Sequence, residues 1–307
     1  MKVAVVANPE KSLDGGLLEL RRVLERAGVT DPLWREVPKS RKAGAAVRRV
    51  VADGAEIVFV WGGDGMLQRS VDVLAGSDVA LAVIPAGTSN LLATNLGIPE
   101  DIEQAVAIGL GGERRRLDVG SINGERFAVM AGTGIDAVMI RDADGSPKEH
   151  LGRVAYVWAG IKNVRSKPFT AEIAVDGVSW FDGKATSVLI GNFGGLLGGI
   201  EVFGDARPDD GMLEVGVVTA QGFAQWARTI ARTVVASGDA SPFVQAAKAR
   251  SVKVKLDRKV LYELDGGDRT KTKSLKVKVE PAAVTVCVPR PSYSSRVSTE
   301  VGSSVAP

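Results

Sequence analysis

The sequence predicts an α/β N-terminal domain with a parallel sheet, followed by a C-terminal, mainly antiparallel β-sandwich domain. Three observations support this fold class. The chain has 307 residues, more than a single domain of about 100–200 residues needs. Apolar strand-like runs alternate with amphipathic helical stretches in the first hundred-odd residues, which is typical of a parallel sheet covered by helices. After residue 115 the pattern changes to short alternating runs separated by turns, so we place the boundary there, between domains 1–115 and 116–289.

The N-terminal elements follow from the periodicity of apolar residues. Strands are expected near Val3–Ala7, Leu33–Val37, Ile57–Trp61 and Val79–Ile84. Helices are expected near Leu17–Ala27, Ala43–Ala52, Met66–Leu74 and Asp101–Leu110. The last helix begins with acidic residues after Pro99, where the helix dipole favours negative charge.

The C-terminal part is expected to consist of short strands joined by turns. Turn signals occur at Asn123-Gly124, Asp176-Gly177 and Asp182-Gly183. Two helical insertions are expected around His150–Lys162 and Phe223–Ala236. The Pro- and Ser-rich residues 290–307 lack apolar periodicity and predict a disordered tail.

The composition is that of an ordinary globular protein, with 45% hydrophobic and 24% charged residues. A net charge of +3 is too small to indicate a nucleic-acid partner. We find neither a signal-peptide pattern nor an apolar run of roughly 18 residues, so a cytoplasmic location is expected. Cys287 is the single cysteine, which excludes an internal disulfide or a cysteine-based metal cluster, and its neighbours predict a packed strand residue.

Basic residues are concentrated in one late segment. They are Lys253, Lys255, Arg258, Lys259, Lys271, Lys273, Lys276 and Lys278. Several alternate with apolar residues, which places them on one face of strands. This face could be an ordinary solvated surface, or it could also rest on anionic headgroups as a peripheral contact at the inner face of the membrane.

A glycine turn follows the third predicted strand. The run Gly62-Gly63-Asp64-Gly65 passes directly into a predicted helix. Glycines let backbone amides approach phosphate oxygens, and the helix N-terminus adds unpaired N–H groups. An aspartate in so anionic a site requires a divalent cation between itself and the phosphates, so Asp64 is a candidate for positioning Mg²⁺. A purely structural turn is the alternative.

Two further polar turns are expected at the same edge of the sheet. Pro85-Ala86-Gly87-Thr88-Ser89-Asn90 follows the fourth strand, and Asn8-Pro9-Glu10-Lys11-Ser12 follows the first. Ligands settle at the ends of adjacent parallel strands, and Thr88 and Asn90 offer uncharged donors, although Thr88 or Ser89 could simply cap a helix. The chain has neither G-x-x-x-x-G-K-[ST] nor a G-x-G-x-x-G after a strand.

These motifs, taken in order, resemble the catalytic domain of the diacylglycerol kinase family, which includes sphingosine and ceramide kinases and bacterial soluble lipid kinases. The matching runs are Asn8-Pro9, Gly62-Gly63-Asp64-Gly65, Pro85-Ala86-Gly87-Thr88-Ser89-Asn90, Gly134-Ile135-Asp136-Ala137 and Asp210-Gly211-Met212-Leu213-Glu214-Val215. The resemblance spans the chain to about Pro289 and implies an N-terminal domain like that of NAD kinase and phosphofructokinase. It also implies ATP and Mg²⁺ as cofactors and a lipid as the substrate.

The resemblance implies roles for particular residues. The nucleotide would be bound by Asn8, Pro9, Glu10, Lys11, Ser12, Ser40, Gly62, Gly63, Asp64, Gly65, Met66, Thr88 and Asn90. A structural Mg²⁺ would be held by the Asp210 carboxylate and the backbone carbonyls of Arg207 and Met212.

The chain departs from the family pattern at two positions. Met66 stands where many members have threonine after the glycine turn, which removes a hydroxyl near the phosphates. Gly267 stands where the family often has the glutamate of Asp-Gly-Glu, the proton acceptor for the lipid hydroxyl. Either Asp265 or Asp268 could replace it, the transfer could rely on positioning and metal electrostatics, or the segment could be a simple hairpin turn.

Three functions are therefore considered. The first is an ATP-dependent lipid kinase with Asp64, Asp265 and Asp268 as catalytic candidates. The second is NAD kinase, whose family shares the glycine turn but has an Asn-Glu dipeptide that this chain lacks. The third is a non-catalytic nucleotide- or lipid-binding regulator, motivated by Met66 and Gly267. A homodimer is compatible with each, His150 is not expected to be catalytic, and the glycine-rich segment Phe193–Ile200 could line an acyl-chain entrance or form a buried bend.

Overall fold

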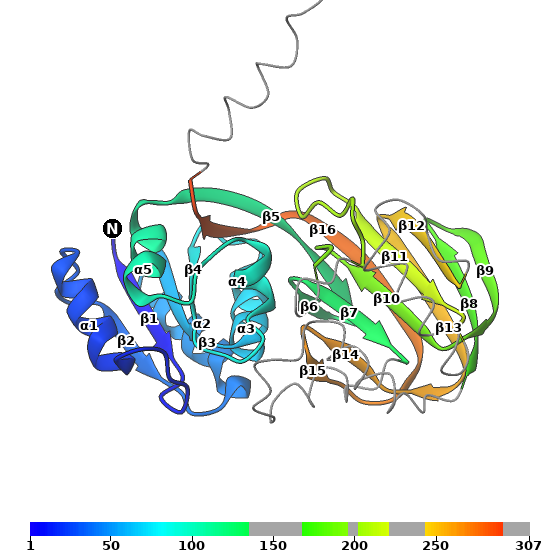
Figure 1. Cartoon of the computed structure of the whole chain (residues 1–307), viewed down its shortest axis with the longest axis horizontal. Helices are drawn as coiled ribbons and strands as arrows, with labels where there is room; N and C mark the ends of the chain where they lie inside the picture. Colours follow the sequence, from blue (N-terminus) through cyan, green and yellow to red (C-terminus); the bar gives the residue numbers. More distant parts are fainter. Residues whose placement is uncertain (135–167, 196–201, 221–242, 291–307) are drawn as a thin grey trace, which may run out of the picture.

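The computed structural model describes residues 1–134, 168–195, 202–220 and 243–290. Figure 1 shows two domains side by side, an α/β domain and a β-sandwich. The predicted helical insertions, His150, most of the glycine-rich segment and the predicted tail beyond residue 290 lie outside the described residues. Within these residues, no helix is both long enough and apolar enough to cross a lipid bilayer.

The N-terminal domain contains the predicted parallel sheet. Its strands run in the order β2 (Leu33–Glu36), β1 (Val3–Ala7), β3 (Ile57–Gly62) and β4 (Ala80–Pro85). Its helices are α1 (Gly16–Arg26), α2 (Ala43–Ala52), α3 (Asp64–Leu74), a short α4 (Leu91–Asn95) and α5 (Ile102–Gly111), with a 3₁₀ turn at Ser40–Lys42. The four predicted strands and four predicted helices are confirmed to within a few residues, because strong apolar periodicity specified each of them.

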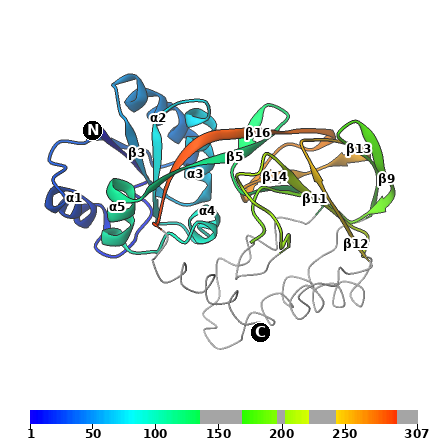
Figure 2. The same cartoon turned by 90° about the horizontal axis from the view of Figure 1, so that it is seen from above.

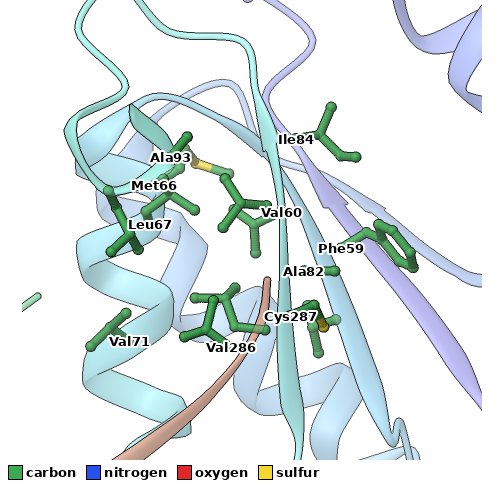
Figure 3. Close-up of a cluster of buried hydrophobic side chains, with 14 of the residues drawn as sticks. Phe59, Val60, Met66, Leu67, Val71, Ala82, Ile84, Ala93, Val286 and Cys287 are labelled. Carbon is green, nitrogen blue, oxygen red and sulfur yellow. The ribbon is translucent and has the colours of Figure 1, made fainter. Parts of the chain in front are cut away.

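Helix α3 packs its apolar side on this sheet. Figure 3 shows Met66, Leu67 and Val71 of α3 facing residues of β3 and β4. Met66 and Leu67 are only 2% and 1% exposed. The helix that begins at the glycine turn is therefore fixed by burial, which holds the turn itself in place.

The C-terminal domain is the predicted antiparallel sandwich. One sheet has the order β12 (Val244–Ala249), β11 (Leu213–Val218), β10 (Ser187–Gly191), β7 (Met130–Thr133), β14 (Tyr262–Leu264) and β15 (Gly267–Asp268). The facing layer contains β16 (Thr272–Val288), β13 (Ser251–Val260), β8 (Phe169–Val175) and β9 (Val178–Ala185). Their inner faces enclose one apolar core.

The alternation of lysines on the late strands is confirmed. Lys253 and Lys255 of β13 are exposed, as are Lys276 and Lys278 of β16, whereas the apolar residues between them are buried. In the ladder Lys253 pairs with Lys276, so the ammonium groups share one outer face.

Two of the three predicted turns are confirmed and one is wrong. Asn123 and Asp176 have φ of 50° and 49° and are each followed by a glycine of positive φ, as a type I′ hairpin turn requires. Asp182 and Gly183 instead lie inside β9, paired with residues of β8. The turn at residues 176–177 already joins β8 to β9, so the second Asp-Gly pair lies within strand β9 and forms no turn.

The last strand belongs to both domains, which the sequence did not indicate. Strand β16 pairs with β13 in the sandwich, and its final residues pair in parallel with β4. Along its length it also pairs with β5 (Glu113–Ile122), which forms a hairpin with β6 (Glu125–Phe127). Figure 2 shows β5 and β16 running together from one domain to the other. The domain boundary near residue 115 stays a prediction, since β5 continues through it without a break.

Candidate active site

Two glycine turns of the N-terminal domain touch each other backbone to backbone. A Cβ atom added to Gly87 would lie 2.3 Å from the Cα of Gly63. Gly63 precedes α3 directly after β3, and Gly87 follows β4, the neighbouring strand. Only glycine at both positions permits this approach, which brings two sets of backbone amides to one place.

A cleft of about 570 Å³ opens beside this contact and reaches both domains. The N-terminal domain contributes Asn8, Lys11, Pro38, Lys39, Ser40, Gly63, Asp64, Gly65, Met66, Gly87, Thr88, Ser89 and Leu91. The sandwich contributes Asp265, Gly266, Gly267 and Asp268 from the hairpin between β14 and β15. The structure therefore brings the glycine turns and the predicted Asp-Gly segment together.

Asp64 is the first residue of α3 and carries an unusual charge environment. Its Oδ1 accepts a hydrogen bond of 2.6 Å from the backbone N–H of Leu91 at the start of α4. Burial and, next to it, the charge of Asp265 raise the pKa of Asp64 to about 6, against the opposing effect of backbone hydrogen bonds. No lysine or arginine pairs with Asp64 among the described residues. A cleft carboxylate that lacks a positive partner is well suited to a divalent cation.

The predicted nucleotide residues separate into two groups. Asn8, Lys11, Ser40, Gly63, Asp64, Gly65, Met66 and Thr88 line the cleft, whereas Pro9, Glu10, Ser12, Gly62 and Asn90 do not. Asn90 contributes indirectly by holding Gly87 in place. Its side chain accepts a hydrogen bond from the Gly87 N–H at 2.9 Å and donates one to the Gly87 carbonyl at 2.8 Å. Gly62 is needed for packing, since a Cβ there would lie 2.6 Å from the Met66 Cγ.

Met66 makes apolar contacts at the position where the family pattern has a threonine hydroxyl. Its side chain is buried in the core beneath the turn, near Leu67 and Ala93 in Figure 3. The residue still borders the cleft. In place of the hydroxyl, the Met66 side chain packs in the core and so stabilises the adjacent glycine turn.

Lys39 was not singled out by sequence reasoning. It follows β2, the fourth strand whose end reaches this edge, and it lines the cleft with Lys11. Both lysines are exposed and bring positive charge to the cleft. Its position between a strand end and Ser40 was the signal that could have identified it.

Asp265 is a poorly available proton acceptor. It is 4% exposed, and its two carboxylate oxygens accept hydrogen bonds from the backbone N–H groups of Ala128, Val129 and Met130. Burial raises its pKa, although these three bonds act in the opposite direction. Asp268, by contrast, is exposed at the rim of the cleft. The catalytic assignments of both residues stay predictions.

The space beside Gly267 is occupied by an arginine. A Cβ on Gly267 would lie 2.9 Å from Arg269 Nη1, and that nitrogen donates to the Gly267 carbonyl. Arg269 also pairs with Glu125 at 2.8 Å. A glutamate at position 267 would need Arg269 to move, which gives the family departure a physical basis.

The predicted structural metal site contains an ammonium group instead of room for a cation. Lys248 Nζ lies 3.3 Å from Asp210 Oδ2, 3.3 Å from Glu214 Oε1 and 3.2 Å from the Asp205 carbonyl. The other Asp210 oxygen accepts from the Met212 N–H at 3.0 Å. Arg207, Asp210 and Met212 are adjacent as predicted, but both Asp210 oxygens already have partners. The residues present therefore do not fit a Mg²⁺ ion at this position unless Lys248 withdraws.

We expect Lys248→Met to create a Mg²⁺ dependence of stability that the native chain lacks at this site. Removing the ammonium leaves Asp210 and Glu214 facing each other, at a cost of roughly 1 kcal/mol, which added Mg²⁺ should recover. Thermal unfolding without nucleotide, in Mg²⁺ and in EDTA, measures the difference. The exposed Lys253→Met is the matched control and should show no such dependence. If the native chain gains as much from Mg²⁺ as the variant, Lys248 does not replace a metal.

The fold and the cleft define a class of two-domain proteins in which an α/β domain and a β-sandwich meet at a glycine-turn cleft. Solved structures of this class include a putative diacylglycerol kinase from Bacillus anthracis (23% identity, 94% of this chain and 96% of that chain, TM-score 0.76). An NAD kinase from Archaeoglobus fulgidus in complex with ATP has the same fold more distantly (13% identity, 94% and 93% covered, TM-score 0.52).

Sequence comparisons identify the family. Residues 2–122 match the diacylglycerol kinase catalytic domain, and residues 129–288 match the YegS C-terminal NAD kinase beta sandwich-like domain. A diacylglycerol kinase of Bacillus subtilis is 32% identical over 216 residues, 69% of this chain and 71% of that protein. A probable YegS-like lipid kinase of an Enterobacter species is 31% identical over 175 residues, 55% of this chain and 58% of that protein. The chain belongs to the diacylglycerol kinase family, and its relatives support a lipid kinase activity in general.

Proposed function

We propose that this protein is an ATP-dependent lipid kinase that transfers the γ-phosphate of ATP to a lipid hydroxyl, such as that of diacylglycerol, with Mg²⁺. The observation that carries the proposal is the contact of Gly63 with Gly87 beside Asp64, at a cleft that both domains line. Family membership supports the same reading. The acceptor is the least constrained part, because lipid pockets are built from interchangeable apolar residues.

The nucleotide half of the site is supported by its charge and backbone geometry. The N-terminus of α3 brings Gly63 and Gly65 to the cleft, and Lys11 and Lys39 provide positive charge for phosphates. Asp64 would hold Mg²⁺, which supplies neutralisation of phosphate charge when bound. Deprotonation of Asp64 is required for this role, so cation binding should strengthen as pH rises through about 6.

Incubating the purified protein with labelled ATP and a broad lipid extract tests the proposal. We expect mass spectrometry to find label in a lipid phosphate, in mixed micelles containing diacylglycerol above all. Label in NADP after addition of NAD would support the NAD kinase alternative instead. Nucleotide binding without turnover on any acceptor would support the non-catalytic regulator and end the kinase proposal.

We also infer that the lysine face of the sandwich contacts anionic lipid headgroups, with the protein held in the cytoplasm at the inner face of the membrane. Exposed Lys253, Lys255, Lys276 and Lys278 on paired strands support this, at roughly 1 kcal/mol for each basic residue near such a surface. Co-sedimentation with phosphatidylserine vesicles and with neutral vesicles tests it, and equal binding to both would contradict it. A homodimer and the absence of a nucleic-acid partner stay predictions.

A further inference from the structure

Glu263 has a buried carboxylate oxygen that no described residue satisfies. It lies in β14 between Tyr262 and Leu264, whose side chains enter the sandwich core. The alternation of a strand therefore directs Glu263 to the opposite face of the sheet. Its Oε2 is buried and has no hydrogen-bond partner in the part of the chain that the structure describes. Among the described residues Glu263 forms no ion pair either. A buried carboxylate oxygen without a hydrogen-bond partner costs stability, so its presence calls for a functional explanation.

The neighbours of Glu263 across the sheet are small or apolar. Glu263 pairs with Gly132 of β7, and Gly132 pairs in turn with Leu189 of β10. A Cβ on Gly132 would lie 4.0 Å from Glu263 Oε1 and 2.9 Å from Leu189 Cδ2. The Glu263 carboxylate therefore lies over bare backbone beside a buried leucine. Neither Gly132 nor Leu189 offers a polar side chain to the carboxylate, so a substrate hydroxyl is a suitable partner for it.

Glu263 is also joined to the cleft by its own hairpin. Its partner across the ladder is Asp268, and the turn after it contains Asp265 and Gly266. All three of these residues line the cleft that the glycine turns border. Strand β14 thus connects the apolar face to the phosphate site within a few residues.

We propose that Glu263 accepts the proton of the acceptor hydroxyl and so performs the role left vacant by Gly267. This inference rests on the proposed lipid kinase function. In the step, the hydroxyl O–H bond breaks as its oxygen forms a bond to the γ-phosphorus, and the proton passes to the Glu263 carboxylate. The bond from the γ-phosphorus to the bridging oxygen breaks, and its electron pair leaves with ADP.

The electrostatics of the site agree with this role. Burial, together with the charges of Asp268 and Asp265, raises the pKa of Glu263 to about 7. Among the described residues, these two aspartates are the titratable groups that act on it, from the turn and from β15, and Gly132 of β7 brings no charge. General bases work best when their pKa lies near the working pH. Asp265 lacks this freedom, since three backbone N–H groups hold it.

The variant Glu263→Gln tests the inference with the shape of the side chain preserved. We expect kcat for lipid phosphorylation to fall by about 10²–10⁴, with nucleotide affinity unchanged. In the native protein kcat should rise with pH through about 7, as Glu263 becomes ionised, and this rise should be absent from the variant. The exposed Glu25→Gln, on α1 of the other domain, is the matched control and should behave as the native protein does.

The outcomes are distinguishable. Native kcat and a native pH profile in Glu263→Gln would overturn this inference and leave the kinase proposal intact. A large loss in Asp268→Asn, with Glu263→Gln active, would assign the proton to Asp268 instead. A purely structural Glu263 would change the unfolding temperature but not the pH profile. A native protein that phosphorylates no lipid would refute the kinase proposal, and this inference with it.

Discussion

Asp64→Asn is expected to abolish phosphoryl transfer and at the same time to make the protein more stable. Asparagine keeps an oxygen that can accept from the Leu91 N–H, so the local structure should persist. Loss of the charge removes the proposed cation ligand, and we expect kcat to fall at least about 100-fold. Burial raises the pKa of Asp64 to about 6 from 3.8. At about 1.4 kcal/mol for each pKa unit, holding the charge at pH 7 costs roughly 3 kcal/mol that the variant avoids.

The stability gained in Asp64→Asn should depend on pH. Because the folded state binds the Asp64 proton more tightly than the unfolded chain does, this residue favours folding below about pH 4, and that contribution is lost as pH rises to about 6. The stability gained in Asp64→Asn should therefore grow between these values and stay constant above them. Urea unfolding at several pH values, without divalent cations, measures it. The exposed Asp78→Asn is the control, and an equal gain there would contradict the argument.

Gly87→Ala is expected to separate the two glycine turns. The new methyl group would lie 2.3 Å from the Cα of Gly63 and 2.7 Å from Asn90 Oδ1. Backbone cannot yield as a flexible side chain can, so the turns must move apart at a cost of about 3 kcal/mol. The amides that converge on the phosphates lose their arrangement, and we expect nucleotide affinity to fall at least tenfold, or about 1.4 kcal/mol. Isothermal titration with an ATP analogue and thermal unfolding measure the two effects.

Gly111→Ala is the matched control for this substitution. Gly111 ends α5, and nothing lies within 4 Å of a Cβ added there. Alanine is a better helix former than glycine, so a gain of about 0.5–1 kcal/mol is expected, with native affinity. If Gly87→Ala also binds nucleotide normally, the two turns do not need their close contact.

The N-terminal half of the site could be predicted because strand ends in a parallel sheet meet at one edge. Glycine turns after β3 and β4 and the polar turn after β1 were each readable, and the cleft contains residues from all three. The sequence could not show that the Asn90 side chain binds the backbone of Gly87, since the same amide could equally contact a ligand. The local sequence pattern predicts which residues lie near an edge of the sheet, but not the direction in which each side chain points.

The features that the sequence did not predict all depend on contacts between residues distant in sequence. Strand alternation in residues 272–288 was visible, but its pairing with β4 is between residues about 200 positions apart. Lys248 is likewise brought to Asp210 by cross-strand pairing of β11 with β12. Glu263 was overlooked because an acidic residue before Asp-Gly is unremarkable in sequence, and only burial without a partner distinguishes it.

The shared strand pair has a mechanical consequence. Both described crossings of the chain between the domains lie in the β5–β16 pair, so the domains are joined by a two-stranded ribbon and not by a single-chain linker. Its ladder is interrupted between Glu280 and Val284, where Ala282 has a φ of 47° and its N–H is held by Asp118. A bulge is the point at which such a ribbon bends most easily. We therefore expect residues 281–283 to be the hinge of any movement of one domain relative to the other.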